Sequence, residues 1–186
     1  MATYHLPMMA DLLNGIPRVD PTRGPTGLRR WVARVPTTKL GAAIHRALFA
    51  PIDAPLMRLT GGRVSSVCGI VPLVVLRTTG ATSGVQRNVP VGYFTDGDDV
   101  ILIATNYGQA KHPSWYYNLL KHPECELLAN GVEGCGSYFI AHLTDGADRD
   151  RLFALAERYS PNYTVYAAKT NGVREIPVLR LTPKAL

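Results

Sequence analysis

The chain has 186 residues, 46% of them hydrophobic and 18% charged, which predicts one folded domain and excludes a disordered chain. Twenty basic residues against 14 acidic ones give a net charge of +6, which would suit nucleic acid, an anionic membrane or a polyanionic cofactor. Three cysteines without CxxC spacing and five histidines without metal-ligand spacing predict neither a disulfide framework nor a metal centre, and favour a reducing cytoplasm.

The N-terminal third carries most of the positive charge. Nine Lys and Arg precede residue 64 against three Asp, and prolines interrupt any helical period between residues 1 and 36. The pattern predicts an irregular basic arm with one helix beginning near residue 37, which Pro51 stops. We therefore divide the chain into an arm, 1–65, and a folded domain, 66–186.

The remainder alternates between β-rich and helical patterns. In chain order it predicts strands at 72–79, 88–94 and 100–105, a helix at 114–121, strands at 124–130 and 136–144, a helix at about 147–159 and a last strand at 175–182. Hairpin signals join several strands, and there are too few helices for a doubly wound sheet. The order predicts an α+β fold, mainly β, built as a small mixed or antiparallel barrel with flanking helices.

Residues 76–87, LRTTGATSGVQR, form a predicted loop between two strands. Gly80 and Gly84 flank the hydroxyl residues Thr82 and Ser83, and an arginine lies at each end. Such a loop can aim backbone N–H groups and hydroxyls at an anion. The spacing matches neither GxxxxGK[ST] nor GxGxxG, and on spacing alone an ordinary glycine-containing hairpin loop is the more common explanation.

Two further segments could line a pocket. Residues 104–119 place a glycine turn and Lys-His-Pro before a helix start, where unpaired N–H donors and three aromatic rings could meet an anion and a planar ring. Trp115 by itself is better explained by core packing. Tyr163 and Tyr166 follow Pro161, and their phenols could line a pocket or cover a core edge.

Three motifs in order resemble the deazaflavin-dependent nitroreductase family. They are LRTTGxxSGxxRxxPxxY, a strand ending AxN before GxxKHPxWYxNL, and a late YxxY followed by IPV, and together they run from about Leu73 to Leu181. The resemblance implies a six-stranded split β-barrel of the FMN-binding split-barrel type. It also implies reduced coenzyme F420 as hydride donor.

The resemblance implies roles for individual positions. The stretch expected to hold the phosphate and oligoglutamate tail comprises Ala81, Thr82, Ser83, Arg87, Asn88, Val89, Pro90, Val91 and Gly92. The strand end expected at the deazaflavin ring comprises Ile103, Ala104, Thr105 and Asn106. The helix start expected near the phospholactate and ribityl part comprises Ser114, Trp115, Tyr116, Tyr117 and Asn118. Tyr163 and Tyr166 match tyrosines at the ring and acceptor pocket, where they could donate a proton, and no metal is implied.

Two departures from the family pattern concern binding. Ala81-Thr82 replaces an Arg-Lys pair usual in this loop, which removes two cations from the predicted tail site. Arg77, Arg87 and Lys111 could compensate. Tyr107 replaces a small residue, and so places bulk beside the expected ring.

The predicted function is an oxidoreductase that passes a hydride from reduced F420 to an electron-poor acceptor such as a quinone, nitroaromatic or activated alkene. Alternatives are a non-catalytic F420 carrier at the membrane surface and an FMN-binding oxidoreductase. The basic segment GLRRWVARVPTTKL could touch anionic lipid at the inner face of the membrane. A homodimer is possible on the sequence, and the basic patches lack the stacking aromatics of a nucleic-acid site.

Overall fold

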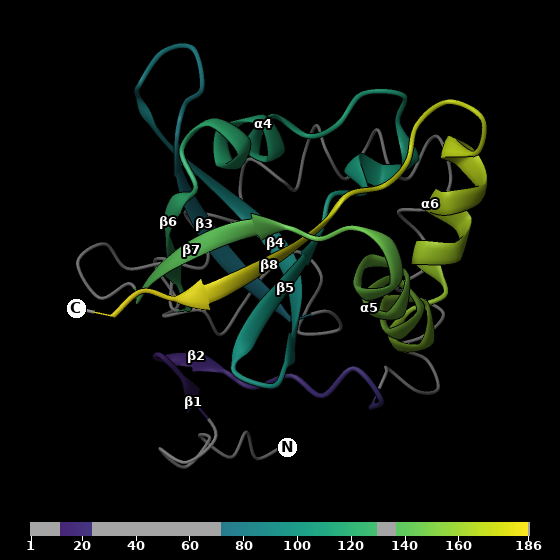
Figure 1. The fold of residues 1–186 in the computed structure, drawn as a ribbon, viewed down its shortest axis with the longest axis horizontal. Coiled ribbons are helices and arrows are strands. Elements are labelled where there is room, and N and C mark those ends of the chain that lie inside the picture. Colours follow the sequence, from purple (N-terminus) through teal and green to yellow (C-terminus); the bar gives the residue numbers. More distant parts are fainter. Residues whose placement is uncertain (1–11, 24–71, 130–136, 186) are drawn as a thin grey trace, which may run out of the picture.

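The computed structural model describes residues 12–23, 72–129 and 137–185. Its centre is a closed antiparallel barrel of six strands in the order β3-β4-β5-β8-β7-β6 (Figure 1). The strands are β3 (Leu73–Thr79), β4 (Gln86–Asp96), β5 (Asp99–Ile103), β6 (Glu124–Leu128), β7 (Ser137–Leu143) and β8 (Val178–Pro183). The predicted α+β six-stranded barrel is confirmed.

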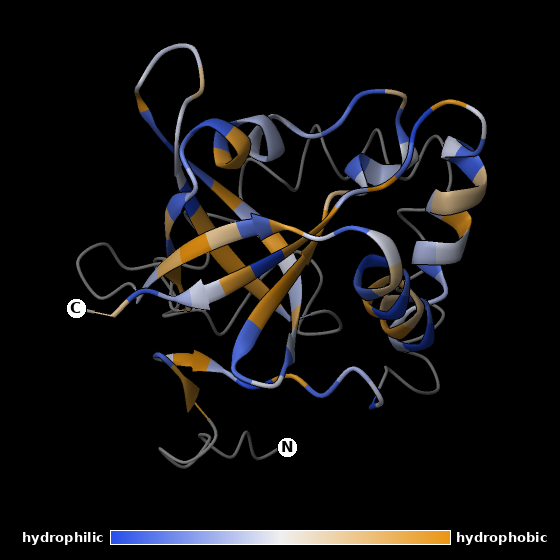
Figure 2. Cartoon of the chain, in the orientation of Figure 1, coloured by the Kyte–Doolittle hydropathy of each residue, from blue (hydrophilic) through white to orange (hydrophobic). Residues whose placement is uncertain are grey.

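The barrel interior is filled by every second residue of the strands. On β3 and β4 these include Val74, Leu76, Val91 and Tyr93, which belong to one buried cluster. Alternation directs their neighbours outward, because successive side chains of a strand point to opposite faces. The strands are accordingly the most hydrophobic part of the ribbon (Figure 2).

Within the residues that the structure describes, three α-helices and one short 3-10 turn flank the barrel. They are η4 (Asn106–Gly108), α4 (Ser114–Lys121), α5 (Gly146–Tyr159) and α6 (Asn162–Thr170). Leu152 and Ala156 of α5 share a second buried cluster with Phe94 and Ile101 on the outer face of the barrel. The opposite side of α5 is polar (Figure 2). Among the described residues, no helix is long and apolar enough to cross a membrane.

A small hairpin lies at the end of the barrel away from α4 (Figure 1). It consists of β1 (Leu12–Leu13) and β2 (Ile16–Pro17). Leu13 and Ile16 are 5% and 1% exposed and belong to the interior cluster of the barrel. The Tyr93 hydroxyl donates to the Pro17 carbonyl at 3.0 Å. These residues were predicted to be irregular arm, but two apolar side chains and a hydrogen bond attach them to the barrel.

Helix α6 was also missed. The sequence predicted a helix only to about residue 159 and no helix after Pro161, yet Pro161 directly precedes the first residue of α6, a position where its missing N–H costs no helical hydrogen bond. The boundary at residue 65 stays a prediction. The helix expected after residue 37 and the Asn-Gly turn at 130–131 lie outside the described residues.

Candidate functional site

The loop between β3 and β4 is closed by its own backbone. Gly80 N–H donates to the Val85 carbonyl and Gly84 N–H to the Gly80 carbonyl, both at 2.9 Å. A Cβ on Gly80 would lie 2.6 Å from Ser83 Oγ and 3.1 Å from the Val85 carbonyl oxygen, so a larger residue would displace the Ser83 hydroxyl and crowd this closure. Within the described parts of the chain, the backbone N–H groups of Thr82 and Ser83 have no hydrogen-bond partner. The loop therefore presents two amides and two hydroxyls to solvent.

Asn118 attaches this loop to α4. Its side-chain oxygen accepts from Ala81 N–H at 2.9 Å, and its amide nitrogen donates to Thr78 Oγ1 at 3.0 Å. Asn118 and Thr78 are both buried. The Asn118 side chain, predicted to bind the cofactor, therefore uses its oxygen and one of its N–H groups to hold the loop.

The cations around the loop differ in availability. Arg77 forms an ion pair with buried Glu126 at 2.8 Å and also donates to Asn88 Oδ1 at 3.1 Å. It is therefore a poor replacement for the missing Arg-Lys pair. Arg87 and Lys111 are exposed and form no ion pair within the described residues.

The predicted tail-binding residues of β4 do not share one face. Val89 and Val91 pack in or against the interior cluster. Asn88 and Pro90 pair with Arg77 and Val75 across β3 and, by alternation, point outward, as does Gly92. The structure therefore places Ala81, Thr82 and Ser83 in the loop and Arg87 opposite Thr78 at its base, and it divides the later positions between two faces of β4.

The chain after β5 makes an unusual turn. Ile103 and Ala104 are buried, and then Asn106, Tyr107 and Gly108 all have positive φ, at 46°, 56° and 72°. Asparagine and glycine tolerate this region, but a tyrosine there costs about 1–2 kcal/mol. The N–H of Asn106 has no partner among the described residues. An available donor in a strained turn is a feature of ligand sites.

Arg174 holds this turn from behind. Its guanidinium donates to the carbonyls of Thr105 at 2.7 Å, Gln109 at 2.8 Å and Ala104 at 3.4 Å. It also contacts His112 Nδ1 at 3.1 Å. Desolvation lowers the pKa of Arg174. The sequence alone did not single out Arg174, because a lone arginine before a strand carries no motif.

Aromatic rings line the start of α4. His112 lies 4.8 Å from the Tyr116 ring and 5.9 Å from the Tyr117 ring, centroid to centroid. Tyr117 is 48% exposed, whereas Tyr116 is 9% exposed. Trp115 packs against the interior cluster, so core packing accounts for this residue at least in part. Ser114, the first residue of α4, is exposed.

Tyr163 and Tyr166 lie on α6 beside the turn. Tyr166 is 7% exposed, and its ring meets Tyr107 edge-on at 6.4 Å. Burial, with a smaller effect from Tyr159, raises the pKa of Tyr163 to about 12. Burial also raises the pKa of Tyr166, as do Tyr107 and Tyr163. Both phenols therefore hold their protons firmly at neutral pH.

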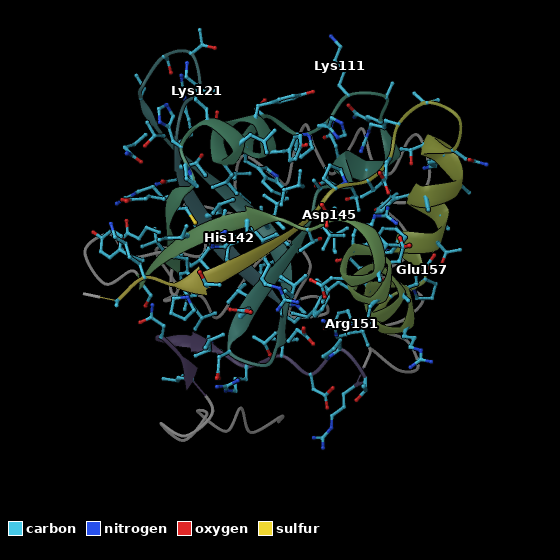
Figure 3. All side chains as sticks on the ribbon, in the orientation of Figure 1. Lys111, Lys121, His142, Asp145, Arg151 and Glu157 are labelled. Carbon is cyan, nitrogen blue, oxygen red and sulfur yellow. The ribbon has the colours of Figure 1, made fainter. Side chains whose placement is uncertain are left out.

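Gly108 allows α6 to approach this closely. A Cβ there would lie 2.9 Å from Lys169 Cδ and 3.3 Å from the Tyr166 Cα. In Figure 1 the loop and α4 lie above the barrel, and the turn lies between α4 and α6, which is at the right. Lys111 and Lys121 project along the upper edge, far from Arg151 (Figure 3).

Comparison with known proteins decides the family. The model of the F420H(2)-dependent quinone reductase family matches residues 52–183. The chain belongs to this family. Membership confirms the predicted oxidoreductase and its cofactor, coenzyme F420.

Individual relatives agree with the family model. An F420H(2)-dependent quinone reductase of Mycobacterium tuberculosis (strain ATCC 25618 / H37Rv) is 30% identical over 157 residues, 83% of this chain and 97% of the relative. A solved F420-H2 dependent reductase superposes with a TM-score of 0.50 at 30% identity, covering 59% of this chain and 93% of that one. A structure described as a domain-swapped dimer gives a TM-score of 0.53 at 27% identity, covering 70% and 96%.

The residues present fit F420. No acidic residue occurs from Val74 to Thr95 or from Val100 to Pro123, so all the charged residues of these two segments are basic. That charge, with the free amides of the loop, suits an anionic tail. The Asn106 N–H and the nearby aromatic rings suit a planar ring with carbonyl oxygens. Within the described ranges no cluster of His, Cys, Asp and Glu could hold a metal ion.

Proposed function

We propose that this reductase binds the tail of F420 at the 80–85 loop and the ring at the 104–109 turn, and reduces a quinone there to the quinol. The observation that carries the proposal is the left-handed turn with its free Asn106 N–H, set beside the rings of α4 and α6. Bound reduced F420 supplies the hydride, and one proton completes the quinol.

The chain's own part is to bind, orient and exclude water. Loop amides and Arg87 would hold the anionic end, while Arg174 and Gly108 keep the turn and α6 together. Holding two reactants in a fixed geometry removes much of the entropic barrier to their reaction. Tyr107 narrows the ring side, which favours flat acceptors.

The proton is better supplied by water than by the two tyrosines. A phenol with a pKa near 12 is about five pH units from its useful range at neutral pH. Tyr163 and Tyr166 would then act as hydrogen-bond donors and as walls of the pocket. The catalytic role predicted for the two tyrosines stays a prediction, limited to donating hydrogen bonds and lining the pocket.

Titration tests the proposal. Purified protein would be titrated with reduced F420 and, separately, with FMN while fluorescence is followed, and menadione or a nitroimidazole would then be added. We expect F420 binding below tens of micromolar, weaker FMN binding and oxidation by menadione. Absence of F420 binding, or binding without oxidation, would contradict the proposal.

Variants of the tyrosines add a second measurement. Tyr163→Phe and Tyr166→Phe should lower kcat by no more than about tenfold if water supplies the proton, because only a hydrogen bond is lost. Tyr138→Phe is the control, since Tyr138 lies on β7 and is 51% exposed. A loss of several thousandfold in either variant would instead identify a proton donor.

Assembly and location are separate proposals. A homodimer is supported by the domain-swapped relative, and a contact with anionic lipid by the basic charge of residues 1–63. The enzyme would then be cytoplasmic and peripheral to the inner membrane face. Flotation on anionic and neutral vesicles, with Arg29, Arg30 and Arg34 changed to Gln as the comparison, tests the contact. Equal recovery in all arms would rule it out.

A further inference from the structure

The Arg174 guanidinium forms hydrogen bonds with several groups of the 104–109 turn. It donates to backbone carbonyls of Ala104, Thr105 and Gln109, and it contacts His112 Nδ1 at 3.1 Å. Within the described residues no carboxylate lies within ion-pair distance of it. Its partners are thus the turn, the histidine and its own neighbour's carbonyl, at 3.3 Å.

The contact with His112 fixes the state of the imidazole. A guanidinium can only donate hydrogen bonds, so Nδ1 must be the acceptor and carries no proton. The ring is then neutral, with its proton on Nε2. Among the described residues Nε2 has no hydrogen-bond partner, which leaves its N–H available to a ligand.

The same guanidinium also stabilises the strained turn. Carbonyls of residues before and after the left-handed segment are drawn to one side, where Arg174 satisfies them. This arrangement leaves the Asn106 N–H without a carbonyl partner among the residues that the structure describes. Two donors, the Asn106 N–H and the His112 Nε2–H, therefore depend on one side chain.

We propose that Arg174 is a positioning residue of the F420 and quinone site, which holds the 104–109 turn and keeps His112 as the neutral Nε2–H tautomer so that both groups can donate to a bound carbonyl oxygen. The proposal rests on the proposed function. Hydrogen bonds aimed at an oxygen that gains negative charge lower the barrier to its reduction. The positive charge of Arg174, which pairs with no carboxylate in the described parts of the chain, acts in the same direction.

The test reads His112 directly in the protein without ligand. Histidines labelled with 15N would be observed by two-bond 1H–15N correlation, and His112→Gln would identify the signal among the five histidines. The groups that face His112 are Arg174 and the rings of Tyr116 and Tyr117. We expect the Nε2–H form at pH 7 and a pKa below the ordinary 6.5, from desolvation and from Arg174.

Arg174→Met should raise the pKa of His112 and mix its tautomers. It should also reduce kcat/KM for menadione by about 100-fold. Arg174→Lys keeps a cation but cannot bridge three carbonyls and a ring, so it should mix the tautomers as well. Arg149→Met is the matched control, because Arg149 is 18% exposed and donates to the Ile176 carbonyl, but does not touch the turn. It should leave the His112 spectrum unchanged.

Two outcomes would overturn the proposal. One is a wild-type His112 that is charged or protonated on Nδ1 at pH 7. Another is an Arg174→Met spectrum identical to wild type, and if that variant does not fold, an Arg174→Lys spectrum identical to wild type has the same meaning. A wild type that fails to oxidise reduced F420 with menadione would refute the proposed function alone, since the spectra need no ligand.

Discussion

The tail-side loop and the ring-side turn are built in opposite ways. The loop, residues 80–85, is mostly exposed, is closed by its own backbone and is attached to α4 through Asn118. The turn, residues 104–109, is held by Arg174, contacts α6 and contains two non-glycine residues of positive φ. Strain is therefore concentrated at the turn.

This difference matches what each end of the cofactor needs. A charged tail is held through long-range attraction, which tolerates displacement and is weakened by salt. A reacting ring must be held within a fraction of an ångström for transfer to a stacked acceptor. The turn would therefore orient the reacting ring, and the open loop would capture the charged tail.

The largest effect should follow Gly108→Ala. The new Cβ would be strained by φ and would meet Lys169 and the α6 backbone, so we expect about 2–4 kcal/mol of destabilisation and a large loss of kcat. Gly172→Ala is the control, because Gly172 has φ +73° but a Cβ added there would meet no atom within 4 Å. It should cost about 1 kcal/mol, as for an alanine at positive φ. Equal losses in denaturant titrations would show that packing of α6 on the turn is unimportant.

Asn118→Ala should produce the next largest effect. It removes two hydrogen bonds and leaves the buried Thr78 hydroxyl with one fewer partner, at about 1–3 kcal/mol. The loop should loosen, so the Kd for F420 should rise while kcat changes little. Asn171→Ala, at an exposed position after α6, is the matched control and should change stability by under about 0.5 kcal/mol. A kcat loss equal to that of Gly108→Ala would contradict the division between capture and orientation.

Restoring cations to the loop should strengthen the binding of F420 through its tail. Ala81→Arg with Thr82→Lys adds two exposed charges, each about 0.5–1 kcal/mol, and should tighten F420 binding by about tenfold. The gain should shrink at high salt and vanish for a deazaflavin that lacks the phosphate and glutamate tail. If the tailless compound gained as much binding affinity, the tail of F420 would not bind at the 80–85 loop.

The smallest effect concerns an ion-pair cluster that belongs to neither region. Arg151 hydrogen bonds lower the pKa of Asp96 and, with Arg180, that of Asp148. A carboxylate whose folded pKa is lowered adds stability above its unfolded pKa, near 3.8, and that stability is lost as pH falls through the folded value. Arg180→Met should therefore reduce stability by under about 1 kcal/mol at pH 7, and the loss should shrink as the pH falls below the ordinary carboxylate pKa of 3.8. A loss independent of pH would exclude the ion pairs as its cause.

The barrel could be predicted because strand alternation and turn residues are local signals. The five strands and two helices of residues 72–159 follow from such patterns, as does the final strand. Helix α6 could not be predicted so simply, because Pro161 ends one helix and begins the next. The hairpin at residues 12–17 is only two residues per strand, and it depends on burial of Leu13 and Ile16 in a barrel that the local sequence does not encode.

The candidate site was predicted where a motif carries it. The glycines and hydroxyls of the loop and the aromatic residues of α4 come from recognisable spacing. Arg174 and the state of His112 depend on contacts across more than 60 residues, between a turn and the segment before β8. The pairing of Arg77 with Glu126 joins two strands 49 residues apart and equally escapes local inspection.

The N-terminal hairpin contributes to the stability of the barrel, so its removal would destabilise a truncated protein. Because Leu13 and Ile16 fill the end of the barrel and Arg18 pairs with Asp98 at 2.7 Å, deletion of the first twenty residues would admit water to the hydrophobic interior. Such a truncated enzyme would lose thermal stability even with every cofactor contact intact. Expression designs that trim or replace the N-terminus should therefore retain residues 12–19.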